Sequence, residues 1–356
     1  MGNLDNANFI KKYDPSGMSK LLGSFPEQVR EAAGIGAGFR LPDGYKREYA
    51  DIVCAGLGGS AIGADIMRSY AADEAMTPIS VVRNYTLPNF VGRDSLVVVS
   101  SYSGNTEETI SAYKDAKARG ARIIAMTSGG RIEEMAKADG NACLIIPPGL
   151  PPRCALGYSF FPLLALMSKI GVIADKSADI DETIGVLAGL KSRLLGPAVS
   201  GKKNTAKKIA AELYGKYPII YGAQDHVDCV VTRWRGQIEE NSKALASSHV
   251  FPEMNHNEIV GWENPKALVR KFVAVVLRDR SDHPRIAKRM DISKAIMKTK
   301  AAKVIEVWSS GESLLARIFS LVYIGDFVSY YLAILNKCDP TPVKRITYLK
   351  NELEKG

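Results

Sequence analysis

Short apolar segments alternate with helix-length spacers through the first part of the chain. These segments, rich in Val and Ile, lie at residues 51–55, 78–83, 95–100, 121–126 and 142–146. Near-continuous apolar strands with such spacers are typical of a parallel sheet that is covered by helices on both faces. The pattern therefore predicts a five-stranded parallel sheet.

The alternation stops at a proline-rich segment and resumes near residue 196. Three further strands are expected at residues 217–221, 272–277 and 303–308, with helices between them. The expected fold class is α/β, with two doubly wound parallel sheets flanked by helices. The expected division is an N-terminal helical segment at 1–45, a first domain at 46–155, a helical connector at 156–195, and a second domain with a C-terminal helix at 196–356.

The composition is that of an ordinary globular protein, with 46% hydrophobic and 24% charged residues among 356. The formal net charge is +9, and such a field attracts anionic small substrates. The densest basic stretch, residues 284–303, lacks interleaved aromatic side chains that could stack on bases. We therefore expect a solvated helix face there and no nucleic-acid partner.

Cysteine usage and apolar segments bear on the cellular location. The five cysteines show no paired spacing, and the N-terminal segment is polar, without a secretory hydrophobic region. This predicts a reducing, cytoplasmic environment and no disulfide framework. The longest apolar window, residues 313–335, contains Arg317 and Asp326, so we expect a buried helix and no membrane span.

A glycine-rich turn, GLGGSAIGADI at residues 56–66, follows the first predicted strand. Glycines and a serine between a strand and a helix are typical of an anion site at the helix N-terminus. The spacing is G-x-G-G-x-x-x-G, and the second strand ends in Val-Val-Arg-Asn without a carboxylate for a ribose. Both features depart from the dinucleotide fingerprint. We therefore expect Gly59 and Ser60 to serve a smaller anion.

A second turn, SSYSGNTEET at residues 100–109, follows the third predicted strand. It carries three hydroxylated side chains, Ser101, Ser103 and Thr106, where a helix is expected to begin. Capping of that helix would explain one of them. Several hydroxyls together with free backbone N–H groups instead indicate an anion site. Two such turns at one sheet edge fit a phosphate monoester better than a dinucleotide.

The segment RWRGQIEENSKALASS, residues 233–248, has helical periodicity and two adjacent glutamates. Glu239 has Arg235 four residues before it and Lys243 four residues after it, the arrangement of a solvated ion-pair face. Glu240 has no cation at these positions, and a poorly solvated carboxylate suits a general base near neutral pH. An ordinary interhelical hydrogen bond would use the same residue, and the helix pattern leaves both interpretations open.

Two further segments carry candidate chemistry. In FPEMNHNEIVGWE, residues 251–263, His256 lies between two asparagines that could fix the tautomer and orientation of its imidazole, and a loop histidine in polar surroundings indicates a functional role. A metal site would use His249, Glu253, His256 and Glu258, but no HExxH or cysteine-pair spacing supports it, so we expect no metal. In PPGLPPRCALGYS, residues 147–159, the prolines would hold Arg153 at the sheet edge. A surface arginine is the alternative.

GLGGSAIG followed by SSYSGNTEET resembles the sugar isomerase (SIS) domain, which binds phosphosugars. The resemblance implies that the phosphate is held by Gly59, Ser60, Ser101, Ser103 and Thr106. With PR followed by a tyrosine, ENSK, PE-x-NHNE and a C-terminal DP…LK, the whole chain resembles the bifunctional phosphoglucose/phosphomannose isomerase family. Ser242 stands where alanine is commoner in that family.

This resemblance implies a cofactor-independent isomerase acting on hexose 6-phosphates. Glu240 would be the base that moves a proton between C1 and C2 through a cis-enediolate, and Arg153 would stabilise the developing negative charge. His256, reaching the site from the neighbouring subunit of a homodimer, would help open the sugar ring. A C-terminal lysine assists ring opening in the family, and Lys350 matches best, although Lys344 is close.

Other SIS-related and nucleotide-dependent functions fit the sequence less well. Glucosamine-6-phosphate synthase needs an N-terminal cysteine nucleophile, and the first cysteine here is Cys54. A phosphosugar-binding SIS regulator without catalysis usually carries a DNA-binding helix-turn-helix, for which residues 1–45 are too short and too rich in Gly and Pro. An NAD-dependent enzyme would need the missing ribose carboxylate.

Overall fold

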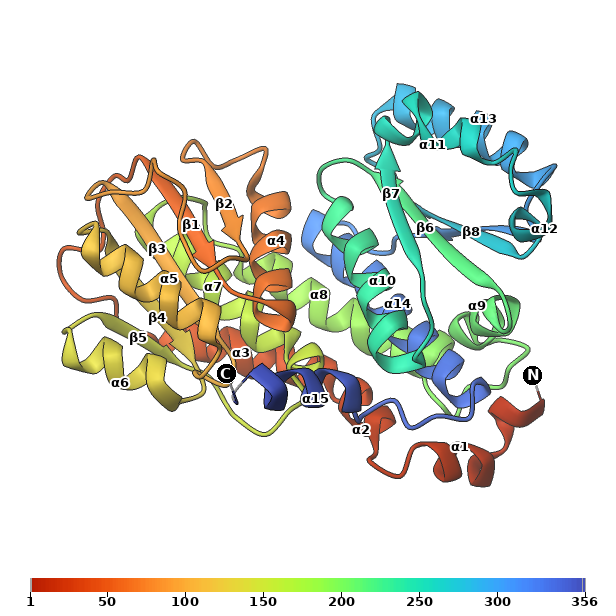
Figure 1. Ribbon diagram of the computed structural model, residues 1–356, viewed down its shortest axis with the longest axis horizontal. Coiled ribbons are helices and arrows are strands. Elements are labelled where there is room, and N and C mark those ends of the chain that lie inside the picture. The colour runs from red at the N-terminus through yellow and green to blue at the C-terminus, as the bar shows by residue number, and fades with distance from the viewer. Residues whose placement is uncertain (1, 354, 356) are drawn as a thin grey trace. The chain divides into compact units, whose positions relative to one another are not determined.

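The computed structural model describes residues 2–353 and 355, which residue contacts divide into two compact units (Figure 1). One unit comprises residues 24–185 and 312–316, and the other comprises the residues up to 23, residues 186–311 and those from 317 onward. Each unit contains one sheet, so we call them the first-sheet unit and the second-sheet unit. The N-terminal segment and the connector of the sequence analysis are therefore shared between the two units.

The first sheet contains five parallel strands in the order β2-β1-β3-β4-β5. They are β1 (Asp51–Ala55), β2 (Ile79–Val82), β3 (Ser95–Ser101), β4 (Arg122–Thr127) and β5 (Ala142–Ile145). Every residue of the central strand β3 is buried, as expected for a valine-rich strand that is covered on both faces. All five predicted strands are present, and no predicted bound differs by more than one residue.

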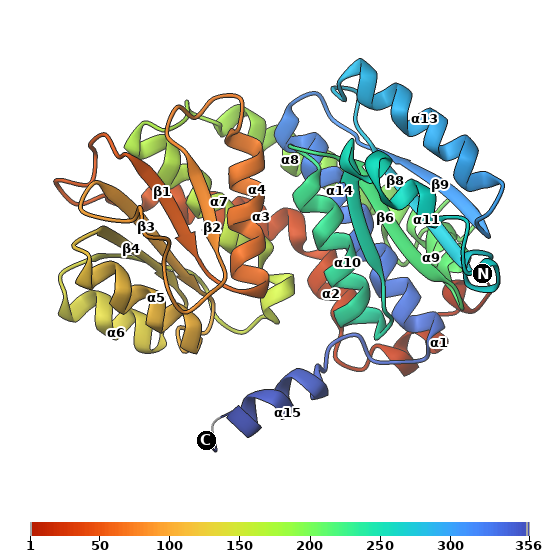
Figure 2. The same ribbon diagram turned by 45° about the horizontal axis from the view of Figure 1, so that its top comes forward.

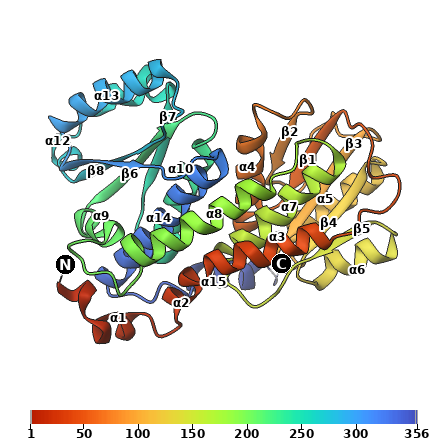
Figure 3. The same cartoon turned by 180° about the vertical axis from the view of Figure 1, so that it is seen from behind.

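Helices cover both faces of the first sheet. On one face, alanines of α5 (Glu107–Ala118) and α6 (Gly130–Ala138) share a core with the valines and isoleucines of β1, β3 and β4. The opposite face carries α3 (Phe25–Gly38), α4 (Gly58–Ala71) and α7 (Leu156–Ile170), and α8 (Ser177–Leu190) follows (Figure 3). This is the doubly wound arrangement, in which helices begin at the edge where the strands end.

The second sheet contains four parallel strands in the order β7-β6-β8-β9. They are β6 (Tyr217–Ala223), β7 (Ser247–Phe251), β8 (Phe272–Arg278) and β9 (Lys303–Trp308). Strand β7 was not predicted, because its sequence SSHVF is polar and only Phe251 is fully buried. The helix expected over residues 233–248 correspondingly ends at Ser242. An edge strand tolerates such a polar sequence.

Helices also lie on both faces of the second sheet, with α10 (Asp228–Ser242) on one face and α13 (Pro284–Lys298) on the other (Figure 2). Further α-helices of this unit are α1 (Ala7–Tyr13), α2 (Met18–Gly23), α9 (Thr205–Leu213), α11 (Glu258–Gly261), α12 (Lys266–Val269), most of α14 (Leu314–Leu335) and α15 (Lys344–Leu353). The expected fold class, two doubly wound parallel sheets flanked by helices, is confirmed.

The helix α14 is long and apolar enough to cross a membrane by length and composition alone. However, 94% of its most apolar 18-residue window is buried inside the protein. Its two charged residues, Arg317 and Asp326, are buried and paired with side chains of opposite charge. This agrees with the core helix that the sequence predicts for this segment.

Buried polar contacts hold α10 against α14. Arg233 donates from Nε and Nη2 to the two carboxylate oxygens of Asp326 at 3.1 and 2.8 Å. Gln237 Nε2 donates to Asp326 Oδ1 at 2.7 Å, and Asn241 Nδ2 donates to Ser329 Oγ at 2.9 Å. The side chains of Arg233 and Asp326 are each only 4% exposed. Since removal of one partner from a buried ion pair is costly, these contacts fix the position of α10.

The substitution Asp326→Ala should therefore destabilise the second-sheet unit strongly, because it removes the carboxylate that Arg233 and Gln237 both contact. We expect the free energy of unfolding to fall by about 3–5 kcal/mol in urea denaturation followed by circular dichroism. Glu134→Ala is the control, because Glu134 pairs with Arg131 through side chains that are 66% and 62% exposed. Equal losses for the two variants would contradict the role given to Asp326.

Candidate functional site

The turn between β1 and α4 places the start of α4 against a second segment of the first-sheet unit. The N-cap residue of α4, Leu57, makes no side-chain capping hydrogen bond. A Cβ atom at Gly59 would lie 2.4 Å from the carbonyl oxygen of Pro152. Glycine at position 59 therefore allows the close approach, and the N-terminus of α4 is left without a side-chain cap.

The turn between β3 and α5 gathers hydroxyl groups at the end of the central strand. Thr106 is the N-cap residue of α5, but its side chain does not cap the helix. Instead, Ser101 Oγ donates to Thr106 Oγ1 and accepts from the Gly104 N–H, both at 3.1 Å. Ser103 Oγ accepts from the Asn105 N–H at 3.3 Å. The Thr106 side chain therefore does not cap α5, and the hydroxyls of Ser101 and Thr106 meet at the helix N-terminus.

Tyr102 connects this turn to two other segments of the first-sheet unit. Its backbone N–H donates to Ser60 Oγ at 3.1 Å. Its hydroxyl donates to the Pro147 carbonyl at 2.9 Å and accepts from the Leu150 N–H at 3.0 Å. The structure thus brings Ser60, the β3–α5 turn and residues 147–153 together. The sequence analysis missed Tyr102, because a tyrosine between two serines does not reveal which distant backbone groups its hydroxyl reaches.

Arg153 lies on a short 3-10 helix (Pro152–Cys154) directly before α7 and is only 5% exposed. The segment is fixed from α3 by Gln28, whose amide donates to the Cys154 carbonyl at 2.9 Å and accepts from the Gly157 N–H at 2.8 Å. The alternative of a surface arginine is therefore wrong. The backbone of Arg153 lies beside the start of α4, and its side chain carries a permanent positive charge.

Glu239 and Glu240 lie in the last turn of α10, and both are half-buried. Both line a cavity of about 900 Å³ in the second-sheet unit, whose other walls include Lys243 and the segment from Pro342 to Ile346. Burial raises the pKa of the Glu239 carboxyl, while Arg235 opposes this and Glu240 adds to it. The expectation of a solvated ion-pair face at Glu239 is therefore wrong, because both carboxyls share the partly desolvated wall.

The end of α10 is connected to the C-terminal segment of the same unit. Lys243 Nζ donates to the backbone carbonyls of Glu240 and Pro340 at 2.5 and 3.1 Å. The bond to Glu240 uses a carbonyl group that the C-terminus of α10 leaves without an intrahelical partner, and the bond to Pro340 ties this end of α10 to the C-terminal segment. Both C-terminal lysines are exposed, but Lys344 lines the cavity together with Glu240, whereas Lys350 lies farther along α15.

His256 ends a short 3-10 helix (Glu253–His256) and is exposed. The amides of Asn255 and Asn257 donate to Ser293 and Glu253, both at 2.7 Å, so the expected orientation of the imidazole by these asparagines is not seen within the described chain. Glu258 accepts a hydrogen bond from the Tyr221 hydroxyl. Within residues 2–353 and 355, no group of three or more His, Cys, Asp or Glu side chains is placed to hold a metal ion.

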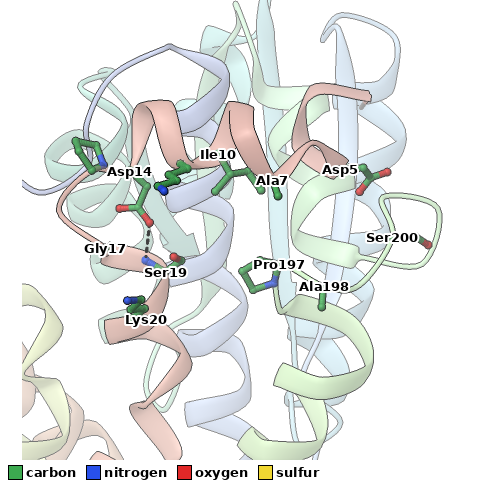
Figure 4. A pocket seen from close by; sticks show the side chains of 12 residues that line it. Asp5, Ala7, Ile10, Asp14, Gly17, Ser19, Lys20, Pro197, Ala198 and Ser200 are labelled. Atoms are coloured by element: carbon green, nitrogen blue, oxygen red, sulfur yellow. Dashed lines mark hydrogen bonds between the residues drawn. The ribbon is translucent and has the colours of Figure 1, made fainter.

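A further cavity of the second-sheet unit, of about 860 Å³, lies between the N-terminal helices and residues 197–200 (Figure 4). Its carboxylates already have partners within the chain. Asp14 accepts from the N–H groups of Met18 and Ser19 at 2.6 and 3.0 Å, and Asp5 accepts from Lys207 Nζ at 2.9 Å. These contacts hold α1 and α2 in place, so we assign this cavity a structural role.

Comparison with known proteins relates the two units to phosphosugar enzymes. Residues 50–150 match the family model of the SIS domain, and residues 202–353 match that of the bacterial phospho-glucose isomerase C-terminal SIS domain. A bifunctional phosphoglucose/phosphomannose isomerase of Caldicellulosiruptor bescii is 50% identical over 337 residues, which are 94% of this chain and 98% of the relative. A protein of the same name from Aquifex aeolicus is 40% identical over 86% of this chain and 91% of its own length.

A similar solved structure is that of a glucose-6-phosphate isomerase-like protein from Thermus thermophilus. It has a TM-score of 0.63 and 20% identity, covering 95% of this chain and 96% of its own. At this identity the likeness shows the fold alone, whereas the two sequence relatives are similar enough to show the family. The chain belongs to the bifunctional phosphoglucose/phosphomannose isomerase family.

Proposed function

We propose that this protein interconverts glucose 6-phosphate and mannose 6-phosphate with fructose 6-phosphate through a cis-enediolate, without a cofactor or a metal. The observation that carries the proposal is the β3–α5 turn, which holds three hydroxylated side chains at a helix without a side-chain cap, with the hydroxyls of Ser101 and Thr106 in contact. This turn occurs in a chain that is 50% identical to a protein named for both isomerase activities.

The phosphate ester binds at the edge of the first sheet. Ser60, Ser101, Ser103 and Thr106 supply hydroxyls, and the N-termini of α4 and α5 supply N–H groups without side-chain caps. A dianion is stabilised there by charge-assisted hydrogen bonds and by the positive end of each helix dipole. Gly59 contributes by letting α4 begin close to the Arg153 segment. A compact phosphate suits these groups better than a dinucleotide.

The proton transfer is assigned to Glu240. As general base it removes the C1 proton of fructose 6-phosphate and returns it to C2 of the enediolate, while Arg153 stabilises the negative oxygen. Because C2 is planar in the enediolate, a proton can be added to either face, which gives glucose or mannose 6-phosphate. The half-buried location of Glu240 beside a cavity supports this role.

Ring opening is assigned to His256 and a C-terminal lysine. We infer that the protein is a cytoplasmic homodimer, in which His256 reaches the sugar bound to the neighbouring subunit. The exposed imidazole, which makes no hydrogen bond within the described residues, supports such a role. Lys350 remains our proposal for the lysine, and the location of Lys344 in the cavity with Glu240 favours Lys344 as the alternative.

The substitution Thr106→Val tests the phosphate site, because it removes one hydroxyl and keeps the shape of the side chain. We expect KM for fructose 6-phosphate to rise about 10- to 100-fold, the effect of one hydrogen bond to a charged group. Thr109→Val, on the same helix, is the matched control, since the Thr109 hydroxyl is buried without a hydrogen-bond partner in the described chain. Similar KM values for the two variants would place the phosphate elsewhere.

The substitution Glu240→Gln tests the base. We expect kcat to fall by about 10²- to 10⁴-fold, because the amide cannot accept the C1 proton, while the Kd for fructose 6-phosphate changes little. Glu239→Gln, which alters the neighbouring half-buried carboxyl, should retain most of the turnover. Near-native turnover of Glu240→Gln would make Glu239 or Glu258 the candidate base.

A coupled assay that starts from fructose 6-phosphate tests the reaction itself. We expect both glucose 6-phosphate and mannose 6-phosphate to appear, at rates that EDTA does not change. Binding of fructose 6-phosphate without turnover would instead support the regulator, and a chelator-sensitive activity that yields mannose 6-phosphate only would rule out the proposed mechanism.

A further inference from the structure

The two sheets contain turns of the same length at corresponding places. In the first sheet β3 lies beside β1, and in the second sheet β8 lies beside β6. Both β3 and β8 are followed by a turn and a helix. Strand β3 ends at Ser101 and the N-cap of α5 is Thr106, while β8 ends at Arg278 and the N-cap of α13 is His283. Four residues therefore separate the strand end from the N-cap in both turns.

The strand pairing strengthens this correspondence. Ser101 pairs with Thr127 in the first sheet, and Arg278 pairs with Trp308 in the second. The next residue along β4 and β9 is a serine in both cases. The Ser128 hydroxyl donates to the backbone carbonyl of Tyr102, which follows Ser101. The Ser309 hydroxyl instead donates to the carboxylate of the residue that follows Arg278.

That residue is Asp279, and its carboxylate is surrounded by donors. It accepts the N–H of Ser281 at 2.9 Å, the hydroxyl of Ser309 at 2.6 Å and Nε of Arg317 at 3.0 Å, and also the Ser281 hydroxyl. Asp279 and Arg317 are only 6% and 8% exposed. Two hydroxyls, a backbone N–H and a guanidinium are the groups that proteins use to bind carboxylates and phosphates.

The charge on Asp279 is favoured despite its location. Burial acts to raise the pKa of Asp279, but the hydroxyls of Ser281 and Ser309, the Ser281 N–H and the Arg317 charge outweigh it, so the net effect is a lowered pKa. The corresponding turn of the first sheet is different. There the hydroxyls of Ser101 and Thr106 bond to each other, and no carboxylate of the described residues accepts from them.

We propose that the β8–α13 turn is an anion site that the chain fills with its own carboxylate, Asp279. The strand edge of the second sheet is thereby closed to phosphosugars, and the donors around Asp279 form a latent site for a small external anion. The inference is independent of the isomerase reaction, because it concerns the occupancy of this turn alone.

Chemical rescue tests this directly. Asp279→Ala removes a carboxylate about the size of formate and leaves the donors of Ser281, Ser309 and Arg317. We expect its thermal unfolding midpoint to be lower than that of the natural protein. Replacing sodium chloride by sodium formate at constant ionic strength should raise it saturably, by at least about 3 °C. The natural protein and the double variant Asp279→Ala/Arg317→Met should show no such rise.

An Asp279→Ala midpoint that is the same in formate and chloride would overturn the proposal. A variant that fails to fold in chloride but is recovered by refolding in formate would support it. A separate measurement uses the natural protein: equilibrium dialysis with fructose 6-phosphate should saturate at one molecule per chain. If each chain bound two molecules of fructose 6-phosphate and the double variant Ser281→Ala/Ser309→Ala bound only one, the β8–α13 turn would be open to phosphosugars. That result would contradict the proposal.

Discussion

Helices that follow parallel strands begin at one edge of the sheet, so their N–H groups and the positive ends of their dipoles gather there. This local excess of positive charge favours an anion, and the rest of the account depends on where that anion comes from. At the first sheet, where hydroxyls lie beside helix starts without side-chain caps, we propose that the anion is the phosphate of the substrate. At the second sheet, Asp279 supplies the negative charge from within the chain.

This difference gives the two halves of the chain different tasks. In the proposed function the first-sheet unit binds the phosphate, and the buried Arg153 of the same unit supplies a positive charge. The second-sheet unit holds the proposed base on α10, and the buried contacts of Arg233 and Gln237 with Asp326 fix that helix. A general base needs such a fixed position, because proton transfer depends strongly on distance and direction.

Much of the fold could be predicted, because strands buried on both faces have an unmistakable apolar sequence. Eight of the nine strands were predicted in this way, and β7 was missed because its edge position allows the polar sequence SSHVF. The β3–α5 turn could also be recognised, because it carries more hydroxyls at one strand end than helix capping needs. The β8–α13 turn could not, since a charged turn looks solvated until the distant Arg317 and Ser309 are brought to Asp279.

The long-range contacts of single side chains account for the remaining differences. Nothing in the local sequence distinguishes the burial of Glu239 from that of Glu240, because the cavity wall is completed by residues about a hundred positions later. The same holds for Lys344 and for the three segments that Tyr102 connects. Such contacts follow from the packing of the whole unit, which local periodicity does not describe.

A crystal structure of the protein with fructose 6-phosphate bound tests the account most directly. The account predicts the phosphate within hydrogen-bond distance of Ser101 and Thr106, with the Asp279 carboxylate still held by Ser281, Ser309 and Arg317. A phosphate at the β8–α13 turn, with Asp279 displaced from these donors, would contradict it.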